Sequence, residues 1–538
     1  MPLYLGLDSS TQSLTAVVIE TTGNRRQVVH TRSFSFDEAL PHYGTHHGVL
    51  PHADPRVVTS SPLMWAEALD LMMGRLRDEV DVRQIAAICG SAQQHGSVYL
   101  NARADAALAG LAPTQPMVEQ IRGIFSREQS PIWMDSSTTE ESREITAAVG
   151  GEAALADRTG SRAFERFTGP QIRKFFKRAP ADYAATTRIH LVSSFLASLL
   201  SGHHAPIDPG DGSGMNLMDL RARRWWPVAL AATAPELDAK LPPVAESWTS
   251  IGLLAPYWQK RYGYAPAHLI AWSGDNPCSL IGTGLVSEGR MAVSMGTSDT
   301  VFGLMDDARV DRSGTGHVFG SPTGAYMGLT VFKNGSLARE RVREALAMDW
   351  RAFSDALART PPASGGIMLP WFEPEITPAV STPGVHRYGQ PSEGPSTIRA
   401  LVESQQLAMA IHSSWMGVRV ETILATGGAA ANREILRVMA DVFGAEVYQL
   451  EVANSAALGA ALRAAHAHAT HEGRPTTWNE IVAGFTEPVA ASRIAPNKER
   501  HALYQEWRRV YEICEAHALG RGPAPDEAIA RFRRDFNA

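Results

Sequence analysis

One plan of strand, hydroxyl-rich corner and strand occurs twice in this sequence. The first copy is LYLGLDSSTQSLTAVVI, residues 3–19, with its corner at Ser10-Thr11-Gln12. The second copy is MAVSMGTSDTVFGLM, residues 291–305, with its corner at Gly296-Thr297-Ser298. The copies lie too far apart for a solenoid repeat. They predict a duplicated α/β domain in which each half offers one hairpin to a shared cleft.

Both corners carry groups that bind phosphate in other proteins. Glycine lets the backbone approach an anion closely, and the hydroxyl and N–H groups that follow can cradle it. Either corner alone is more often an ordinary turn. The pair favours a nucleotide site, and its candidate residues are Ser10, Thr11, Gln12, Gly296 and Thr297.

An acid stands between the two copies, at the end of an apolar run. Leu269–Trp272 is typical of a buried strand, and Ser273-Gly274-Asp275-Asn276-Pro277 then ends it. Open α/β sheets bind ligands at the carboxyl ends of their strands. An acid there, about 20 residues before a phosphate corner, suggests phosphoryl transfer, although Asp-Asn-Pro is also ordinary turn chemistry.

Two further polar groups follow predicted strands in the first half. Asp8 ends the strand Leu3–Leu7 and is placed to hold Mg²⁺, directly or through water, because Mg²⁺ prefers few carboxylates plus phosphate oxygens. Gln94 and His95 follow the strand Ile85–Cys89 and suit a polyol. A lone histidine is otherwise more often structural.

The adenosine side of the site is expected near residue 428. Thr422–Thr426 is a predicted strand, and Gly427-Gly428 follow it directly. The helix after them places Ile435, Val438, Met439 and Val442 on one face and ends at Gly444. A strand, a glycine pair and a helix start let a nucleotide lie close to the backbone, although a glycine pair alone is weak evidence.

Composition bounds the remaining possibilities. The 538 residues are too many for one core, and 44% hydrophobic with 20% charged residues is ordinary for a soluble protein. A net charge of −6 gives no basic field for nucleic acid or a membrane surface. Three cysteines without metal spacing indicate a reducing compartment, and we expect a cytoplasmic protein. The apolar segment Ile189–Leu200 is too short to span a bilayer, and the N-terminal strand lacks the basic region of a signal peptide.

A boundary between two halves is expected near Ile251–Ala265, just before the stretch that carries Asp275. We expect a first half, residues 1–255, that binds the acceptor and a second half, residues 256–538, that binds the nucleotide. The His-rich segment Pro41–Pro55 is predicted to be a plain loop rather than a metal site. The Pro/Gly-rich segment Pro361–Pro395 is predicted to be a long irregular excursion, either functional or peripheral. The sequence leaves open whether the protein is a monomer or a homodimer.

Several motifs together resemble the FGGY family of carbohydrate kinases over nearly the whole chain, most closely its xylulokinase group in the eukaryotic-type branch. The motifs are GLDSSTQ, GSAQQHGS, SPIWMDSSTT, TGSRAFERFTG, IDPGDGSGMNL, GDNP, SMGTSDT, FKNGSLARE and ILATGGAAANREIL. The resemblance implies two ribonuclease-H-like domains of the actin/hexokinase/Hsp70 type. It also implies transfer of the γ-phosphoryl group of ATP, with Mg²⁺, to O5 of D-xylulose.

The resemblance assigns roles to residues as well. It implies that Asp275 is the general base, with Asp8 near the metal and the phosphates. It implies sugar contacts from Gln94, His95, Arg166, Asp275 and Asn276, and adenine-side contacts from Trp350, Gly427, Gly428, Ala429 and Asn432. The chain departs from many relatives at Gln94, where bacterial members have Met, and at Thr15, where many carry a cation.

Two alternatives to this function remain. Within the class, the acceptor is another pentulose or a polyol. In a different class, the chain is an actin/Hsp70-like ATPase that switches conformation without a sugar. The strand-end Asp275 and the polar pair Gln94-His95 favour the kinase.

Overall fold

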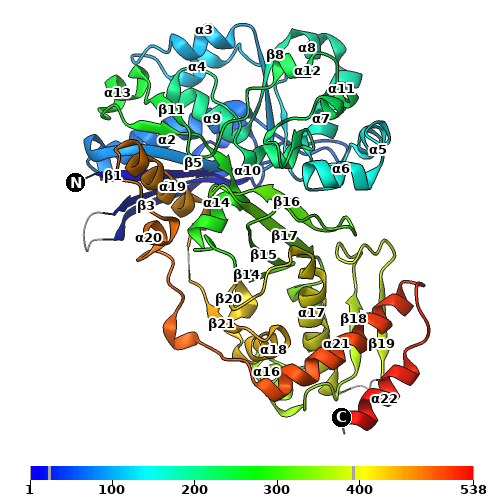
Figure 1. The fold of residues 1–538 in the computed structure, drawn as a ribbon. Coiled ribbons are helices and arrows are strands. Elements are labelled where there is room, and N and C mark those ends of the chain that lie inside the picture. Colours follow the sequence, from blue (N-terminus) through cyan, green and yellow to red (C-terminus); the bar gives the residue numbers. More distant parts are fainter. Residues whose placement is uncertain (1, 22–25, 390–393, 452, 537–538) are drawn as a thin grey trace.

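The computed structural model describes residues 2–21, 26–389, 394–451 and 453–536, which form two lobes (Figure 1). The upper lobe contains a seven-stranded sheet in the order β11-β12-β5-β1-β2-β3, with β13 beside β5. Its strands are β1 (Leu3–Ser9), β2 (Ser13–Glu20), β3 (Gln27–Ser35), β5 (Ile85–Ala92), β11 (Ser250–Leu253), β12 (His268–Ile270) and β13 (Ser273–Gly274).

The lower lobe contains a six-stranded sheet in the order β16-β17-β15-β14-β20-β21. Its strands are β14 (Arg290–Met295), β15 (Asp299–Met305), β16 (His317–Gly320), β17 (Tyr326–Phe332), β20 (Thr422–Thr426) and β21 (Glu446–Gln449). In both sheets the first strand pairs antiparallel with the second, and it pairs parallel with a strand that comes later in the chain, β5 in the first sheet and β20 in the second. This shared order confirms the duplicated α/β fold.

Strand β1 shows how the first sheet is covered on both faces. Leu5 and Leu7 point into a core shared with α2 (Pro62–Glu79) and α9 (Val192–Ser201). Tyr4 points to the opposite face, into a core shared with α19 (Ser455–His471). A Cβ on Gly6 would lie 2.0 Å from the Ala457 carbonyl oxygen, so only glycine allows α19 to approach β1 this closely.

Helix α19 follows the second sheet in the chain but packs on the first (Figure 1). It also crosses α14 (Asp275–Gly282), the helix that follows β13. A Cβ on Gly282 or on Gly459 would lie 1.9 Å from a carbonyl oxygen of the facing helix. The two glycines therefore set the separation of α14 and α19, and this crossing is one of the places where the halves of the chain meet.

The predicted division at 255/256 falls within the first sheet. Strands β12 and β13 come after it, and the chain passes to the second sheet only between Gly274 and Arg290. The prediction placed the boundary near Ile251–Ala265, just before the stretch that carries Asp275. Residues 251–265 instead contain α13 (Pro256–Tyr262), which packs on α2.

Two other predictions about segments can be compared with the fold. The His-rich segment forms a short 3₁₀ turn (Pro41–Tyr43) and a loop, in which Asp37 accepts hydrogen bonds from Thr45 and Gly48. The segment Pro361–Pro395 is more regular than expected, because β18 (Ile367–Trp371) and β19 (Gly384–Tyr388) pair as a hairpin. The many Pro and Gly residues of this segment hid the buried apolar run of β18 from the sequence analysis. Residues 390–393 of the segment lie outside the described residues.

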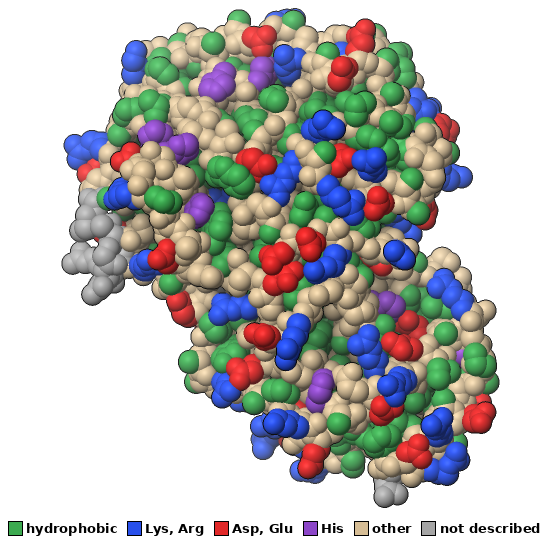
Figure 2. Space-filling view, in the orientation of Figure 1, with side chains coloured by type: hydrophobic (Ala, Val, Ile, Leu, Met, Phe, Trp, Pro, Cys, Tyr) green, Lys and Arg blue, Asp and Glu red, His purple; other side chains and the backbone are tan. Residues whose placement is uncertain are grey.

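Among the described residues, no helix combines the length and the hydropathy needed to cross a membrane. Cys89, Cys278 and Cys514 are buried and free. On the face shown in Figure 2, acidic and basic side chains alternate without a large patch of either sign.

Candidate active site

The carboxyl ends of three neighbouring strands place polar groups side by side. In the parallel pairing of β1 and β5, Asp8 lies opposite Ser91. On the other side of β5, Ser273 of β13 lies opposite the same Ser91. The chain enters α14 one residue after Gly274, so Asp275 begins this helix beside the strand ends. This is the edge of the sheet at which the sequence predicted a site.

Asp275 is held as the first residue of α14. Its Oδ1 accepts hydrogen bonds from the backbone N–H of Asn276 at 2.8 Å and from the Asn276 amide at 3.1 Å. Burial and, to a smaller degree, the charge of Asp8 raise the pKa of Asp275 to about 7, against the lowering effect of nearby backbone N–H donors. A carboxylate with a pKa near working pH is well matched to accept a proton.

Asp8 lies on β1, at the same edge of the sheet. The hydroxyl groups of Ser10 and Ser91 each donate to one of its carboxylate oxygens, both at 2.5 Å. Burial raises the pKa of Asp8, and these two hydroxyl donors partly offset the rise. The carboxylate keeps free lone pairs beside the hairpin corner, which is the donor chemistry that Mg²⁺ accepts.

His95 is neutral and has a fixed tautomer. Its Nδ1 lies 2.8 Å from the Gly214 carbonyl oxygen, which can only accept, so Nδ1 carries the proton and Nε2 is an acceptor. Burial, together with the Arg166 cation, lowers the pKa of His95 to about 3. The ring stacks on Phe167 at 4.4 Å. A Cβ on Gly214 would lie 2.8 Å from the ring, so glycine is required there.

Gln94, which follows β5, connects the end of that strand to Asn276 at the start of α14. Its Oε1 accepts from the Asn276 amide at 2.8 Å, and its Nε2 donates to the Gly210 carbonyl at 3.3 Å. A Cβ on Gly274 would lie 2.3 Å from the Gln94 side chain. The contact fixes the Asn276 amide, which in turn hydrogen-bonds Asp275.

A cavity of about 830 Å³ lies between the two halves, in front of these groups. The predicted sugar-side residues all line it: Gln94, His95, Arg166, Asp275 and Asn276. Seven further lining residues lie in motifs that the sequence analysis quoted: Trp133, Met134, Ser136, Arg162, Phe164, Glu165 and Thr300. The lining residues that sequence reasoning missed come from the second half: His317, Phe319, Leu329, Val331, Glu375, Ile376 and Ala379. No quoted motif marks these missed residues, which come from β16, β17 and the loop around Glu375.

Asp135 also lines the cavity, but its oxygens are occupied. Oδ1 accepts from the Ser137 backbone and hydroxyl groups and from the Gln171 amide, and Oδ2 accepts from the Val58 N–H. These bonds hold the loop that precedes α5 (Thr139–Ala148). Asp135 therefore has a structural role. Of the two acids, Asp275 is the better candidate for the general base.

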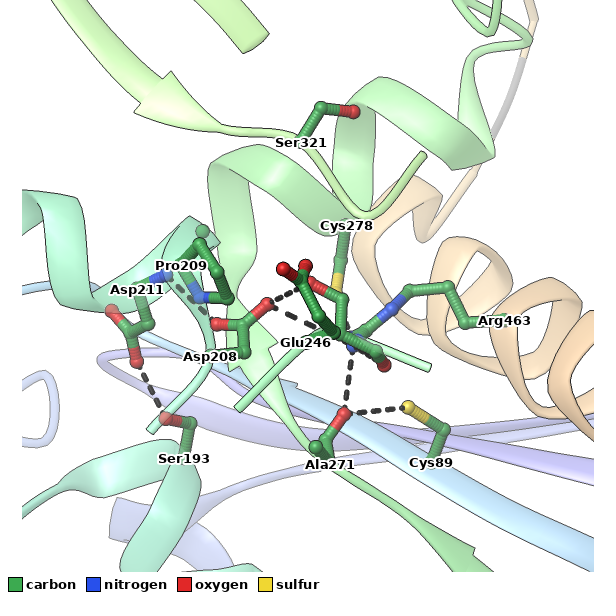
Figure 3. Close-up of polar contacts among 12 residues, drawn as sticks. Cys89, Ser193, Asp208, Pro209, Asp211, Glu246, Ala271, Cys278, Ser321 and Arg463 are labelled. Atoms are coloured by element: carbon green, nitrogen blue, oxygen red, sulfur yellow. Dashed lines mark hydrogen bonds and ion pairs between the residues drawn. The ribbon is translucent and has the colours of Figure 1, made fainter. Parts of the chain in front are cut away.

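A polar cluster around Arg463 connects the residues that flank the Asp275 segment; Figure 3 shows this cluster. Arg463 of α19 donates to the Ala271 carbonyl at 2.7 Å, touches the Cys278 sulfur at 3.1 Å and lies 3.9 Å from Asp208. Ala271 precedes β13 and Cys278 lies in α14. Arg463 thus ties the ends of the segment that carries Asp275 to the helix that joins the lobes.

Asp211 extends the cluster in Figure 3, where Ser193 donates to its Oδ2 at 2.5 Å. Burial raises the pKa of Asp211 well above its ordinary value, and the charges of Asp208 and Asp275 add to the rise. These surroundings favour the neutral form of Asp211.

The predicted adenosine-side residues lie outside the cavity, around the carboxyl end of β20. Gly427 has φ +86°, and a Cβ on it would lie 2.5 Å from the Met295 carbonyl oxygen at the second hairpin corner. A Cβ on Gly428 would have nothing within 4 Å, so open space lies before it. Gly428 begins a 3₁₀ turn that includes Ala429.

Asn432 and Trp350 stand at the starts of two helices that pack on each other. The Asn432 side chain caps α18 (Arg433–Phe443) and donates to Ser354 of α16 (Trp350–Arg359) at 2.8 Å. Helix α18 has the apolar face and the glycine end that the sequence predicted. Trp350 begins α16 and is 42% exposed, which is unusual for a tryptophan; the guanidinium group of Arg343 lies over its ring, 4.8 Å from the centroid.

The fold and this arrangement are those of sugar kinases that share an actin/hexokinase-type architecture. Residues 128–282 match the N-terminal domain, and residues 291–468 the C-terminal domain, of the FGGY family of carbohydrate kinases. The chain belongs to this family and is a carbohydrate kinase, a class that uses ATP as the phosphoryl donor.

Individual relatives of the chain include xylulose kinases. The xylulose kinase of Mus musculus is 42% identical, covering 97% of this chain and 96% of its own. Xylulose kinase 2 of Arabidopsis thaliana is 43% identical, covering 86% of this chain and 87% of its own. The crystal structure of a xylulose kinase from Rhodospirillum rubrum superposes with a TM-score of 0.79 at 19% identity, covering 96% of this chain and 99% of that one. This last likeness concerns the fold alone.

Proposed function

We propose that the protein transfers the γ-phosphoryl group of ATP to O5 of D-xylulose, giving D-xylulose 5-phosphate. The observation that carries the proposal is the partly buried Asp275, with a pKa near 7, in a cavity whose other polar lining suits hydroxyl groups. The choice of D-xylulose rests on the relatives at 42% and 43% identity.

Five polar groups of the cavity have roles in this proposal. Asp275 orients the acceptor hydroxyl and takes its proton as the bond to phosphorus forms. The Nε2 of His95 accepts a hydrogen bond from a sugar hydroxyl, since Nδ1 carries the proton. Arg166 keeps its charge, because burial lowers its pKa only to about 10, and it donates to sugar oxygens. Gln94 and Asn276 complete the set.

The proposed nucleotide site lies across the two hairpin corners and the β20 loop. Ser10, Thr11, Gln12, Gly296 and Thr297 offer donors to the phosphates, and the shelf of Gly427, Gly428, Ala429, Asn432 and Trp350 holds the adenosine. Asp8 would hold Mg²⁺, directly or through water, and the ion would neutralise charge on the phosphates. The half that contains the first sheet binds the sugar, and the half that contains the second sheet binds the nucleotide.

We also propose a cytoplasmic location and a monomeric or homodimeric state. Burial raises the pKa of Cys89, Cys278 and Cys514, so their thiols stay protonated and unpaired, as suits a reducing compartment. Size-exclusion chromatography with light scattering would distinguish monomer from dimer.

An ADP-release assay across ketoses and polyols tests the function. ADP release should depend on added D-xylulose, and NMR of the product should place the phosphate on O5. Faster turnover with another pentulose or with a polyol would move the proposal to that acceptor. ATP hydrolysis that is equally fast without sugar would favour the nucleotide-switch alternative. Asp275→Asn serves as the control for contaminating kinases.

A further inference from the structure

A strand of the second half completes the sugar side of the cavity. His317 begins β16, and its Nε2 lies 3.2 Å from Nη2 of Arg166, which comes from the first half. Its Nδ1 lies 3.1 Å from the hydroxyl of Ser161. The ring is 2% exposed. His317 was not among the residues that the sequence marked, although it lies against one that was.

Hydrogen-bond chemistry fixes the form of this histidine. A guanidinium group has only donors, so Nε2 of His317 must be unprotonated to accept from Arg166. Nδ1 therefore carries the proton and donates to Ser161. Protonating Nε2 would set two donors and two positive charges against each other. His317 is therefore a neutral acceptor with one usable tautomer.

The surroundings keep His317 neutral. Its ring contacts Phe164 at 4.8 Å and Phe319 at 5.9 Å between centroids. Burial lowers the pKa of His317 well below its ordinary value, and the cations of Arg166 and Arg162, together with His95, lower it further. Arg166 also stacks over Phe164, at 4.7 Å from its guanidinium carbon to the ring centroid.

Strand β16 is bonded to the first half as well as to its own sheet. It pairs with β17. The N–H of Val318 donates to the Gly160 carbonyl at 2.9 Å, and the N–H of Gly320 donates to the Ser213 hydroxyl at 3.0 Å. A Cβ on Gly160 would lie 2.3 Å from the Val318 carbonyl oxygen. These contacts hold His317 at a fixed place beside Arg166.

We infer that His317 is a positioning residue: it accepts a hydrogen bond from Arg166 and so aims the other guanidinium donors at the sugar. The inference rests on the proposed function, in which Arg166 binds the sugar. It assigns to the second half, expected to serve the nucleotide, a direct part in sugar affinity. The sugar site is complete only where β16 is docked on the first half.

The test is a double-mutant cycle on the intact protein, with KM for D-xylulose and for ATP as readouts. His317→Leu removes the acceptor and should raise KM for D-xylulose by about 10–100-fold, the value of a hydrogen bond to a charged group. KM for ATP should change less than about threefold. His317→Gln retains an acceptor oxygen and should recover most of the affinity. In an Arg166→Ala background, His317→Leu should have little further effect, because its target is gone.

Two further variants separate the positioning role of His317 from a general loss of stability. Ser161→Ala removes only the hydroxyl group that accepts from Nδ1 of His317 and should raise KM for D-xylulose by a few fold. His190→Leu removes another fully buried histidine, which bonds Ser194 and His204 away from the cavity. It should lower the melting temperature without changing KM for D-xylulose.

The outcomes separate this inference from the proposed function. If Arg166→Ala leaves KM for D-xylulose unchanged, the proposed sugar site itself fails. If Arg166→Ala raises KM but His317→Leu does not, or if the two effects multiply fully in the double variant, the positioning role is overturned. An equal loss of ATP and sugar affinity in folded His317→Leu would also overturn it.

Discussion

Replacing Asp275 with asparagine should change activity and stability in opposite directions. The asparagine side chain is nearly isosteric but cannot accept a proton, so kcat should fall by about 10²–10⁴-fold, the usual contribution of a positioned base. ATP affinity should stay close to that of the wild type, because the adenosine shelf lies outside the cavity that Asp275 lines. The same variant should unfold at a higher temperature near pH 8.

The stability gain follows from the pKa of Asp275. Burial raises this pKa from 3.8 to about 7, a preference for the neutral form of up to about 4 kcal/mol. The folded protein therefore holds the proton more tightly than the unfolded chain, and stability falls as pH rises from about 4 to about 7. Asparagine resembles the neutral form at every pH. Its advantage should be largest at pH 8 and should shrink toward pH 4.

The pH dependence of wild-type activity gives a third readout. With a pKa of about 7, the base is about one-tenth ionised at pH 6, half at pH 7 and nine-tenths at pH 8. We expect kcat/KM for D-xylulose to rise about tenfold per pH unit below 6 and to level off above 8. His95, with a pKa of about 3, cannot produce this limb.

The assays are steady-state ADP release between pH 5.5 and 8.5, isothermal titration with ATP, and thermal unfolding at pH 5 and pH 8. Asp135→Asn is the matched control, since it alters a cavity-lining acid whose oxygens are held by structural hydrogen bonds. The reasoning is refuted if folded Asp275→Asn keeps more than about a tenth of the wild-type rate. A wild-type kcat/KM that does not change with pH would refute the pKa assigned to Asp275. If Asp275→Asn is no more stable than the wild type at pH 8, burial is not the cause of that pKa.

Three other substitutions test separate parts of the structure. Asp8→Asn should slow turnover, and raised Mg²⁺ should partly restore it if Asp8 acts at the metal; a rate that does not respond to Mg²⁺ would contradict that role. Gly428→Val should fold normally, since a Cβ there meets nothing within 4 Å, and should weaken ATP binding by calorimetry far more than sugar binding; unchanged ATP affinity would refute the adenosine shelf. Gly459→Ala places a Cβ 1.9 Å from the Cys278 carbonyl and should cost about 1–3 kcal/mol in denaturant unfolding, whereas an unchanged midpoint would mean that α14 and α19 separate freely.

The sequence determined the features that depend on neighbours along the chain. The two hairpins, the acid after Leu269–Trp272 and the glycines after Thr422–Thr426 were all visible, because strand patterns and turn residues act over a few positions. The repeated plan then indicated two similar domains, and the common strand order of the two sheets confirms this. The residues Gln94, His95 and Asp275 were predicted to be near one another, and they line one cavity.

Only the tertiary structure decided the features that join distant segments. The pKa of Asp275 depends on burial and on Asp8, which lies in another strand far away in sequence. The contact of His317 with Arg166 depends on β16 docking across the two halves. The sheet that contains β12 and β13, and the crossing of α14 and α19 at two glycines, set where one half ends and the other begins. Long-range packing fixes these features, and it leaves no periodic signal in the local sequence.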